Sequence, residues 1–187
     1  MADGTSTEFR NWDGRSRTGS YRVDWLVPNQ EVPERAHAAL DSRARRSLGL
    51  ACGVGRHVLA LADIGLEVDA FDVSRTRLTE VSAQAEKHGL SVSKHIGDMT
   101  ELPFADVFYD FLKFWNVIYH GDEPALRQAI EEIYRVLRPG GMMLVTMLSK
   151  QNADSVSAGR FRRNSGSIGM LNMTRPTRTT SATRARL

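Results

Sequence analysis

Two short segments of the chain have residue types and a spacing that suit a bound nucleotide. The segment 51–55 (ACGVG) follows a short apolar run, and its glycines, which lack a Cβ, would let a ligand approach the backbone closely. Asp72 stands nineteen residues after Gly53, close to the roughly 20 residues expected between a glycine turn and an acid that accepts hydrogen bonds from ribose hydroxyls. The turn alone is equally compatible with a merely tight turn, whereas the turn and the spaced acid together favour a nucleotide site.

Several other kinds of site are excluded or disfavoured. A dinucleotide fingerprint (G-x-G-x-x-G) fails because Val58 occupies the position of the third glycine, and no Gly-Lys-Ser/Thr follows to make a P-loop. Cys52 is the only cysteine, so it has no disulfide partner in the chain, and we interpret it as a small residue that fills the turn rather than a nucleophile. The five histidines are too scattered for metal-ligand spacing, so no metal site is expected.

Strand and helix patterns alternate along the chain and predict the elements that would position these residues. Apolar runs and caps predict strands near 47–51, 67–72, 91–96, 108–115 and 142–148, and helices near 56–65, 74–89 and 122–137, the last ended by the sequence RPGG. This order predicts an α/β fold with a Rossmann-like, doubly wound and mostly parallel sheet covered on both faces. In such sheets ligands bind at the carboxyl ends of the strands where the winding reverses.

Five ordered motifs give the chain a more specific likeness. The motifs are, in order, LACGVGRH, FDVS, GDMTELPF, YDF with WNVIYH, and LRPGGM. With them, the segment from about residue 45 to 150 resembles the class I S-adenosylmethionine-dependent methyltransferases that act on small molecules. The aromatic residues between Asn11 and Trp25 are similar to the N-terminal cap of these enzymes.

The resemblance implies that S-adenosyl-L-methionine is the cofactor and that a small molecule accepts its methyl group. By this likeness Gly53 and Gly55 would line the methionine part, Asp72 would hold the ribose hydroxyls, and Asp98 and Met99 would flank the adenine. The expected cofactor-binding residues are Ala51, Cys52, Gly53, Gly55, Asp72, Val73, Asp98, Met99, Trp115 and Asn116.

No catalytic residue is assigned. The sulfonium already activates the methyl group, so alignment of the acceptor would supply much of the rate enhancement. Tyr21, His57 and His120 are candidates near the site, but each also has a purely structural interpretation. Trp115 and Asn116, at the end of the fourth strand, would face the methionine part and the transferred methyl group.

Three residues depart from the family pattern. Gly49 stands where related sequences carry an acid that organises the turn, so we expect weakened cofactor binding, and Ala51 replaces the first glycine. Lys113 interrupts the apolar fourth strand, where buried lysines are rare unless paired. We expect its amine to reach toward an edge of the sheet.

The composition marks residues 151–187 as a disordered basic tail, and the resemblance implies a cap segment (1–40) and a cofactor-binding domain (41–150). Residues 155–187 hold seven arginines and no acid, so the overall charge of +3 divides into −4 for residues 1–154 and +7 for the tail. The tail shows no hydrophobic period and should not pack, so the last two strands of the family's sheet are expected to be missing. One hypothesis is a shifted reading frame near Asp154, which would leave the fifth strand as an open edge; the other is a genuine disordered tail.

Two function classes remain open. The first is a methyltransferase, whole or impaired. The second is a protein without catalysis, either a cofactor-binding remnant or, less favoured, a nucleic-acid partner acting through its arginines. No leader-like or membrane-spanning apolar segment stands out, so a cytoplasmic location is expected, and the oligomeric state is open.

Overall fold

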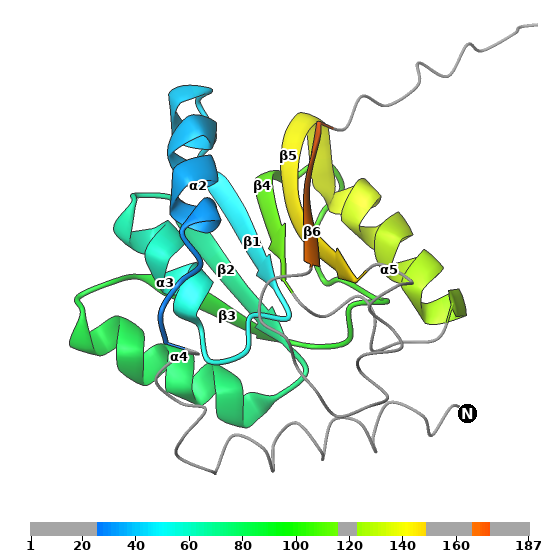
Figure 1. Ribbon diagram of the computed structural model, residues 1–187. Helices are drawn as coiled ribbons and strands as arrows, with labels where there is room; N and C mark the ends of the chain where they lie inside the picture. Colours follow the sequence, from blue (N-terminus) through cyan, green and yellow to red (C-terminus); the bar gives the residue numbers. More distant parts are fainter. Residues whose placement is uncertain (1–25, 116–122, 149–165, 173–187) are drawn as a thin grey trace, which may run out of the picture.

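The computed structural model describes residues 26–115, 123–148 and 166–172, which form one six-stranded sheet with helices on both faces (Figure 1). The strand order is β3-β2-β1-β4-β5-β6. β1 to β5 are parallel, and β6 is antiparallel to β5. The elements are α2 (Glu31–Asp41), β1 (Arg46–Leu50), α3 (Arg56–Asp63), β2 (Glu67–Asp72), α4 (Arg75–Lys87), β3 (Val92–Ile96), β4 (Tyr109–Phe114), α5 (Glu123–Val136), β5 (Leu137–Leu148) and β6 (Gly166–Asn172). The predicted doubly wound sheet is therefore confirmed.

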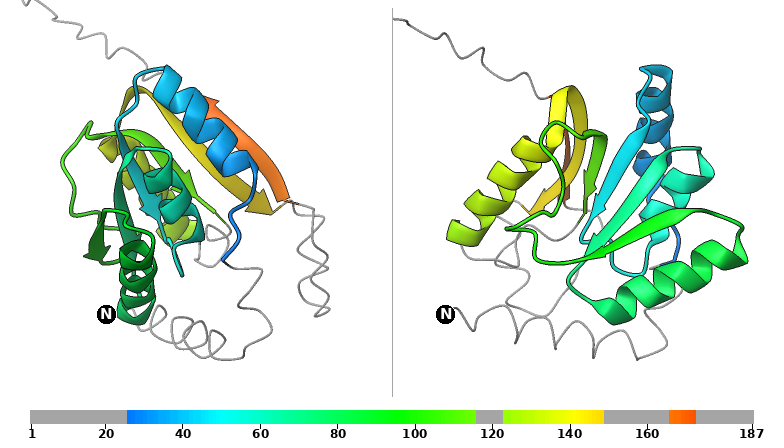
Figure 2. Two further views of the ribbon diagram at one scale, coloured as in Figure 1. Left: turned by 90° about the vertical axis from the view of Figure 1, so that its left-hand side faces the viewer. Right: turned by 180° about the vertical axis from the view of Figure 1, so that it is seen from behind.

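The helices α2, α3 and α4 cover one face of the sheet, and α5 covers the other (Figure 2). On the first face Val58 of α3 and Val81 of α4 pack with Ala70 of β2 in one buried cluster. On the second face Ile133 of α5 packs with Leu112 of β4, and part of the loop between β3 and β4, residues 97–108, joins this cluster. Burial on both faces explains why the central strands read as continuous apolar runs.

The local signals at α4 act as the sequence predicts. The Ser74 side chain accepts a hydrogen bond from the Arg77 backbone N–H at 3.3 Å, which caps the first turn. Gly89 follows the helix with a φ of 66°, a conformation that glycine adopts without steric cost. The capped helix thus begins three residues after Asp72, which is the last residue of β2.

The region after α5 differs from the prediction. The predicted helix end just before RPGG is confirmed to within one residue, since α5 ends at Val136. The predicted strand start at 142 is wrong, because β5 begins at Leu137. The register between β4 and β5 shifts between Tyr109 and Phe111, and this irregularity accommodates the additional residues of β5. Asp122, the predicted cap, lies outside the described residues.

The prediction that residues 151–187 form no packed structure is wrong at residues 166–172. This segment forms β6 and pairs with β5, with Leu144 opposite Met170 and Thr146 opposite Ile168. Hydrogen bonds of a strand ladder join backbone groups, so a segment rich in polar residues and glycine can supply them. β5 is consequently an interior strand, and one of the two strands expected to be missing has a counterpart in β6.

Two features of the described residues bear on the kinds of site that the fold can hold. No described helix is long and apolar enough to cross a membrane. Within the described ranges no three His, Cys, Asp or Glu side chains gather as a metal site would require.

Candidate functional site at the carboxyl edge of the sheet

The turn after β1 has the backbone conformation that glycine favours. Gly53 and Gly55 have φ angles of 57° and 91°, and Ala51 adopts a φ of 47° without being glycine. A Cβ on Gly53 would meet nothing within 4 Å, whereas one on Gly55 would lie 2.7 Å from Val81 Cγ2. Gly53 thus leaves its backbone open to a ligand, and Gly55 permits the close approach of α4.

Asp72 joins this turn to the end of β2. Its Oδ2 accepts a hydrogen bond from the Gly53 backbone N–H at 2.8 Å, and its Oδ1 accepts one from the Ser74 N–H at 2.9 Å. The carboxylate is buried, but the next side chain, Val73, is 49% exposed. An acid that holds the glycine turn therefore stands beside an apolar side chain that faces solvent.

Asp98 and Met99 lie in loop 97–108, at the same edge. The Gly97 backbone N–H donates to the Asp72 carbonyl oxygen at 3.2 Å, which links this loop to β2. Asp98 Oδ1 accepts from both the backbone N–H and the hydroxyl of Thr100, at 2.9 and 2.8 Å. Met99 packs in part against the core cluster beneath α5. Asp98 therefore caps its own turn, and its Oδ2 makes no hydrogen bond to any described residue.

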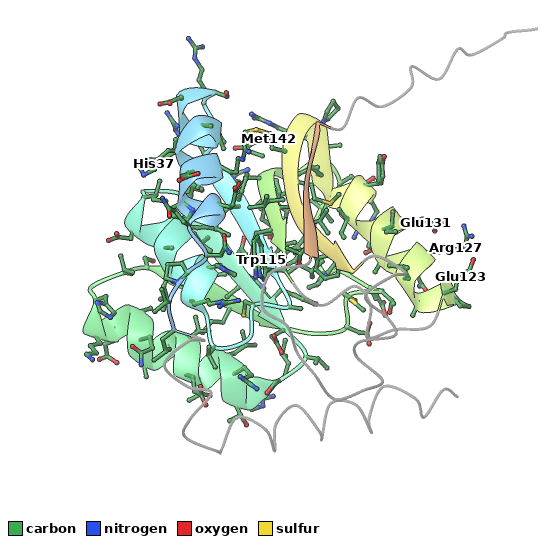
Figure 3. All side chains as sticks on the ribbon, viewed as in Figure 1. His37, Trp115, Glu123, Arg127, Glu131 and Met142 are labelled. Atoms are coloured by element: carbon green, nitrogen blue, oxygen red, sulfur yellow. The ribbon has the colours of Figure 1, made fainter. Side chains whose placement is uncertain are left out.

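Trp115 follows β4 and lies next to α3, in the middle of the edge (Figure 3). Its ring centroid is 5.1 Å from that of His57. His57 Nε2 accepts a hydrogen bond from the Asn29 backbone N–H at 3.2 Å, and burial lowers the pKa of the imidazole, with Lys113 and Arg56 adding to the effect. His57 is therefore neutral. Its hydrogen bond links the segment before α2 to α3, a contact that could not be predicted from the sequence.

Cys52 is buried in the same turn. Burial, followed by the negative charge of Asp72, raises the pKa of its thiol, so the sulfur stays protonated at neutral pH. This agrees with the interpretation of Cys52 as a residue that fills the turn.

Gly49 and Lys113 lie side by side on β1 and β4, in one row with Ala70 and Leu144. A Cβ on Gly49 would overlap Val58 Cγ1, so α3 packs directly on the backbone of β1 and leaves no room for a side chain at this position. The expectation that Lys113 reaches an edge of the sheet is wrong, because its side chain is buried at 2% exposure on the face that α2 and α3 cover.

The structure thus brings nine of the ten expected residues to one edge, at the carboxyl ends of β1 to β4. The tenth, Asn116, and the catalytic candidates Tyr21 and His120 lie outside the described residues. Because β1 and β4 are neighbours in the sheet but belong to opposite directions of winding, this edge is the position where doubly wound sheets bind ligands.

The chain is similar in sequence to known proteins. A relative from Mycolicibacterium smegmatis, named a probable S-adenosylmethionine-dependent methyltransferase, is 33% identical over 137 residues, which are 73% of this chain and 49% of the relative. The chain spans about half the length of the curated relatives it matches.

Solved structures are similar as well. The PH0226 protein from Pyrococcus horikoshii matches with a TM-score of 0.60 and 26% identity over 78% of this chain and 64% of that one. The cyclase SpnF matches with a TM-score of 0.53 and 27% identity over 61% of this chain and 44% of that one. The fold by itself therefore does not fix the reaction.

The family model described as a methyltransferase domain matches residues 48–141, which contain the turn after β1, Asp72, loop 97–108 and Trp115. From this match over half of its length, the chain belongs to the methyltransferase domain family.

Proposed function

We propose that the carboxyl edge binds S-adenosylmethionine and that the chain transfers the methyl group of this cofactor to a small-molecule acceptor. The observation that carries the proposal is the 2.8 Å hydrogen bond between Gly53 and Asp72, which joins the glycine turn to the spaced acid. The family match and the name of the relative from Mycolicibacterium smegmatis support it.

The side chains at the edge fit the parts of this cofactor. Each oxygen of Asp72 accepts one backbone hydrogen bond, and a carboxylate oxygen has two lone pairs, so capacity remains for two ribose hydroxyls. Val73 offers an exposed apolar surface for the adenine ring. Asp98 Oδ2 is available to accept from the exocyclic amine, and the open backbone of Gly53 suits the methionine part.

When bound, S-adenosylmethionine supplies a methyl group that its sulfonium has already activated. The residues of the chain then need to bind and orient, and such positioning can lower a barrier by roughly 7–11 kcal/mol. His57 does not serve as a base in this proposal, since its Nε2 already accepts a backbone hydrogen bond and its pKa is lowered by burial. Cys52 does not serve as a nucleophile, since burial raises the pKa of its thiol. The rings of His57 and Trp115 line the proposed site at the end of β4.

Titration calorimetry with S-adenosylmethionine and S-adenosylhomocysteine tests the binding step. We expect the wild-type chain to bind both, and Asp72→Asn to weaken binding by about 10–100-fold, because a charge-assisted hydrogen bond contributes about 1.5–3 kcal/mol. Asp63→Asn, at the exposed end of α3, is the matched control and should bind like the wild type. The absence of heat with either ligand at high micromolar concentration would contradict the proposal.

Methyl transfer needs a separate test, because a non-catalytic cofactor-binding protein would share the same fold and the same turn. The enzyme hypothesis predicts that S-adenosylhomocysteine accumulates when the chain is incubated with S-adenosylmethionine and a mixture of small-molecule acceptors. Binding without accumulation for any acceptor would favour the non-catalytic alternative.

A further inference from the structure

Lys113 is a fully buried cation in the centre of the sheet. It lies on β4 between Gly49 of β1 and Leu144 of β5, and its side chain is 2% exposed. It forms no hydrogen bond or ion pair with any residue that the structure describes. A buried ammonium without a counter-ion is costly, because its hydration is lost and nothing on the described protein replaces it.

The charged and titratable groups that act on Lys113 all lie at the candidate site. They are Cys52 of the glycine turn, Arg56 and His57 of α3, and Asp72 of β2. Burial, with a smaller contribution from Arg56, lowers the pKa of Lys113 to about 8, while Cys52 and Asp72 oppose the shift. Lys113 is therefore still largely protonated at neutral pH.

None of these groups neutralises Lys113. Asp72 directs its two oxygens at the backbone N–H groups of Gly53 and Ser74, His57 is neutral, and the Cys52 thiol is protonated. Arg56 adds a second positive charge. Among the described residues, the amine of Lys113 is therefore left without a counter-ion.

The packing at Gly49 leaves no negative charge beside Lys113. There α3 approaches so closely that Val58 occupies the space of any side chain. Lys113 is the neighbour of Gly49 in the same row. At this level of the sheet, β1 thus supplies no charged side chain and β4 supplies a positive one.

We propose that Lys113 binds an anionic group of the ligand that enters at the glycine turn, and that this group is the carboxylate of the cofactor's methionine part. The inference rests on the proposed function, within which the methionine part lies against Gly53 and Gly55 and the carboxylate is the one anionic group of the ligand. Lys113 is a binding and specificity residue in this account, since it favours ligands that carry the carboxylate over those that lack it.

The test compares two ligands that differ in the part that Lys113 would contact. S-adenosylhomocysteine carries the amino acid, whereas 5′-methylthioadenosine has the same adenosine and thioether without it. We expect Lys113→Met to weaken the affinity for S-adenosylhomocysteine at least tenfold in calorimetry. The affinity for 5′-methylthioadenosine should change less than twofold. Lys87→Met, on an exposed lysine at the end of α4, should change neither affinity.

The outcomes separate this inference from the function on which it rests. A wild-type chain that binds neither ligand overturns both. If the wild-type chain binds both ligands, the variant decides the role of Lys113 alone. That role is overturned if Lys113→Met leaves both affinities unchanged or weakens them by the same factor.

A second measurement uses the wild type and does not depend on the variant's folding. A carboxylate partner stabilises the protonated amine, so the ratio of the S-adenosylhomocysteine affinity to the 5′-methylthioadenosine affinity should be largest below pH 8. It should fall as the pH rises through and above 8, where Lys113 loses its proton. A ratio that stays constant between pH 6.5 and 9.5 would overturn the inference.

Discussion

Lys113 should make the stability of the unliganded chain depend on pH. Its pKa in the folded chain is about 8, against 10.5 for an ordinary lysine, so the unfolded chain binds more protons between these two values. The destabilisation of the folded chain by the charged amine is therefore fully present below pH 8 and disappears as the pH rises toward 10.5. We expect Lys113→Met to stabilise the unliganded chain at pH 7 by an amount on the order of 3 kcal/mol.

Thermal unfolding of the two chains at several pH values checks this expectation. The gap between the melting temperatures of Lys113→Met and wild type should narrow steadily from pH 7 to pH 10. An equal gap at every pH, or a variant less stable than wild type at pH 7, would show that the charge of Lys113 is compensated within the chain.

At the scale of single residues, sequence spacing anticipated the contacts that backbone geometry dictates. Asp72 and Gly53 were paired by their separation along the chain, and they meet because β1 and β2 are parallel neighbours of similar length. The position of Lys113 was not predictable in this way. Whether a lysine in an apolar strand is buried depends on which helices cover it and on how closely α3 packs at Gly49, and both are properties of the tertiary structure.

At the scale of elements, Arg135 of α5 holds loop 97–108 against the sheet. Its Nη1 donates to the Phe104 carbonyl oxygen at 2.6 Å, and its Nη2 donates to the Leu102 carbonyl oxygen at 2.8 Å. The Glu132 side chain accepts from the Leu102 backbone N–H at 2.7 Å and pairs with Arg135. The loop that carries Asp98 and Met99 is thus positioned by one arginine outside the family's glycine and acid motifs.

Arg135→Met should therefore release this loop. We expect it to destabilise the chain by about 2–3 kcal/mol, since it removes several hydrogen bonds from a charged donor, and to speed hydrogen exchange at the Leu102 amide. Arg127→Met is the matched control on the same helix, because its ion pair with Glu123 is exposed (Figure 3) and should contribute less than about 1 kcal/mol. Equal effects of the two substitutions would contradict the role of Arg135.

Prediction of the elements succeeded where a local signal fixes an end. The Ser74 cap and Gly89 delimit α4 as expected, and β2 has the predicted bounds. Prediction failed at the start of β5 and at β6, because there the pairing with a neighbouring strand determines which residues form the strand. The RPGG sequence resembles a stop after a helix, yet pairing with β4 extends the strand through it, and β6 forms by pairing with β5 despite a composition typical of disorder.

At the scale of the whole molecule, β6 changes the interpretation of the basic tail. The arginines give residues 155–187 a charge of +7, but part of this segment completes the sheet beside β5. The division into an acidic body and a separate tail therefore does not hold for residues 166–172.

Removal of residues 151–187 should make the chain associate. It would expose the unpaired backbone groups of β5, which form a template for a second strand. Light scattering should detect larger species for this truncation, while a chain that ends at residue 173 and keeps β6 should behave like the full chain. S-adenosylhomocysteine affinity should be similar in both truncations, since the candidate site lies on β1 to β4. Identical light scattering from both truncations would contradict the role of β6.

The central claim is that the carboxyl edge between β1 and β4 is a cofactor site. A crystal structure of the chain with S-adenosylhomocysteine tests it most directly. The account predicts ligand density with the ribose hydroxyls at hydrogen-bond distance from Asp72, the adenine between Val73 and Met99, and the carboxylate at Lys113. Density at any other surface, or none at the edge with saturating ligand, would contradict it.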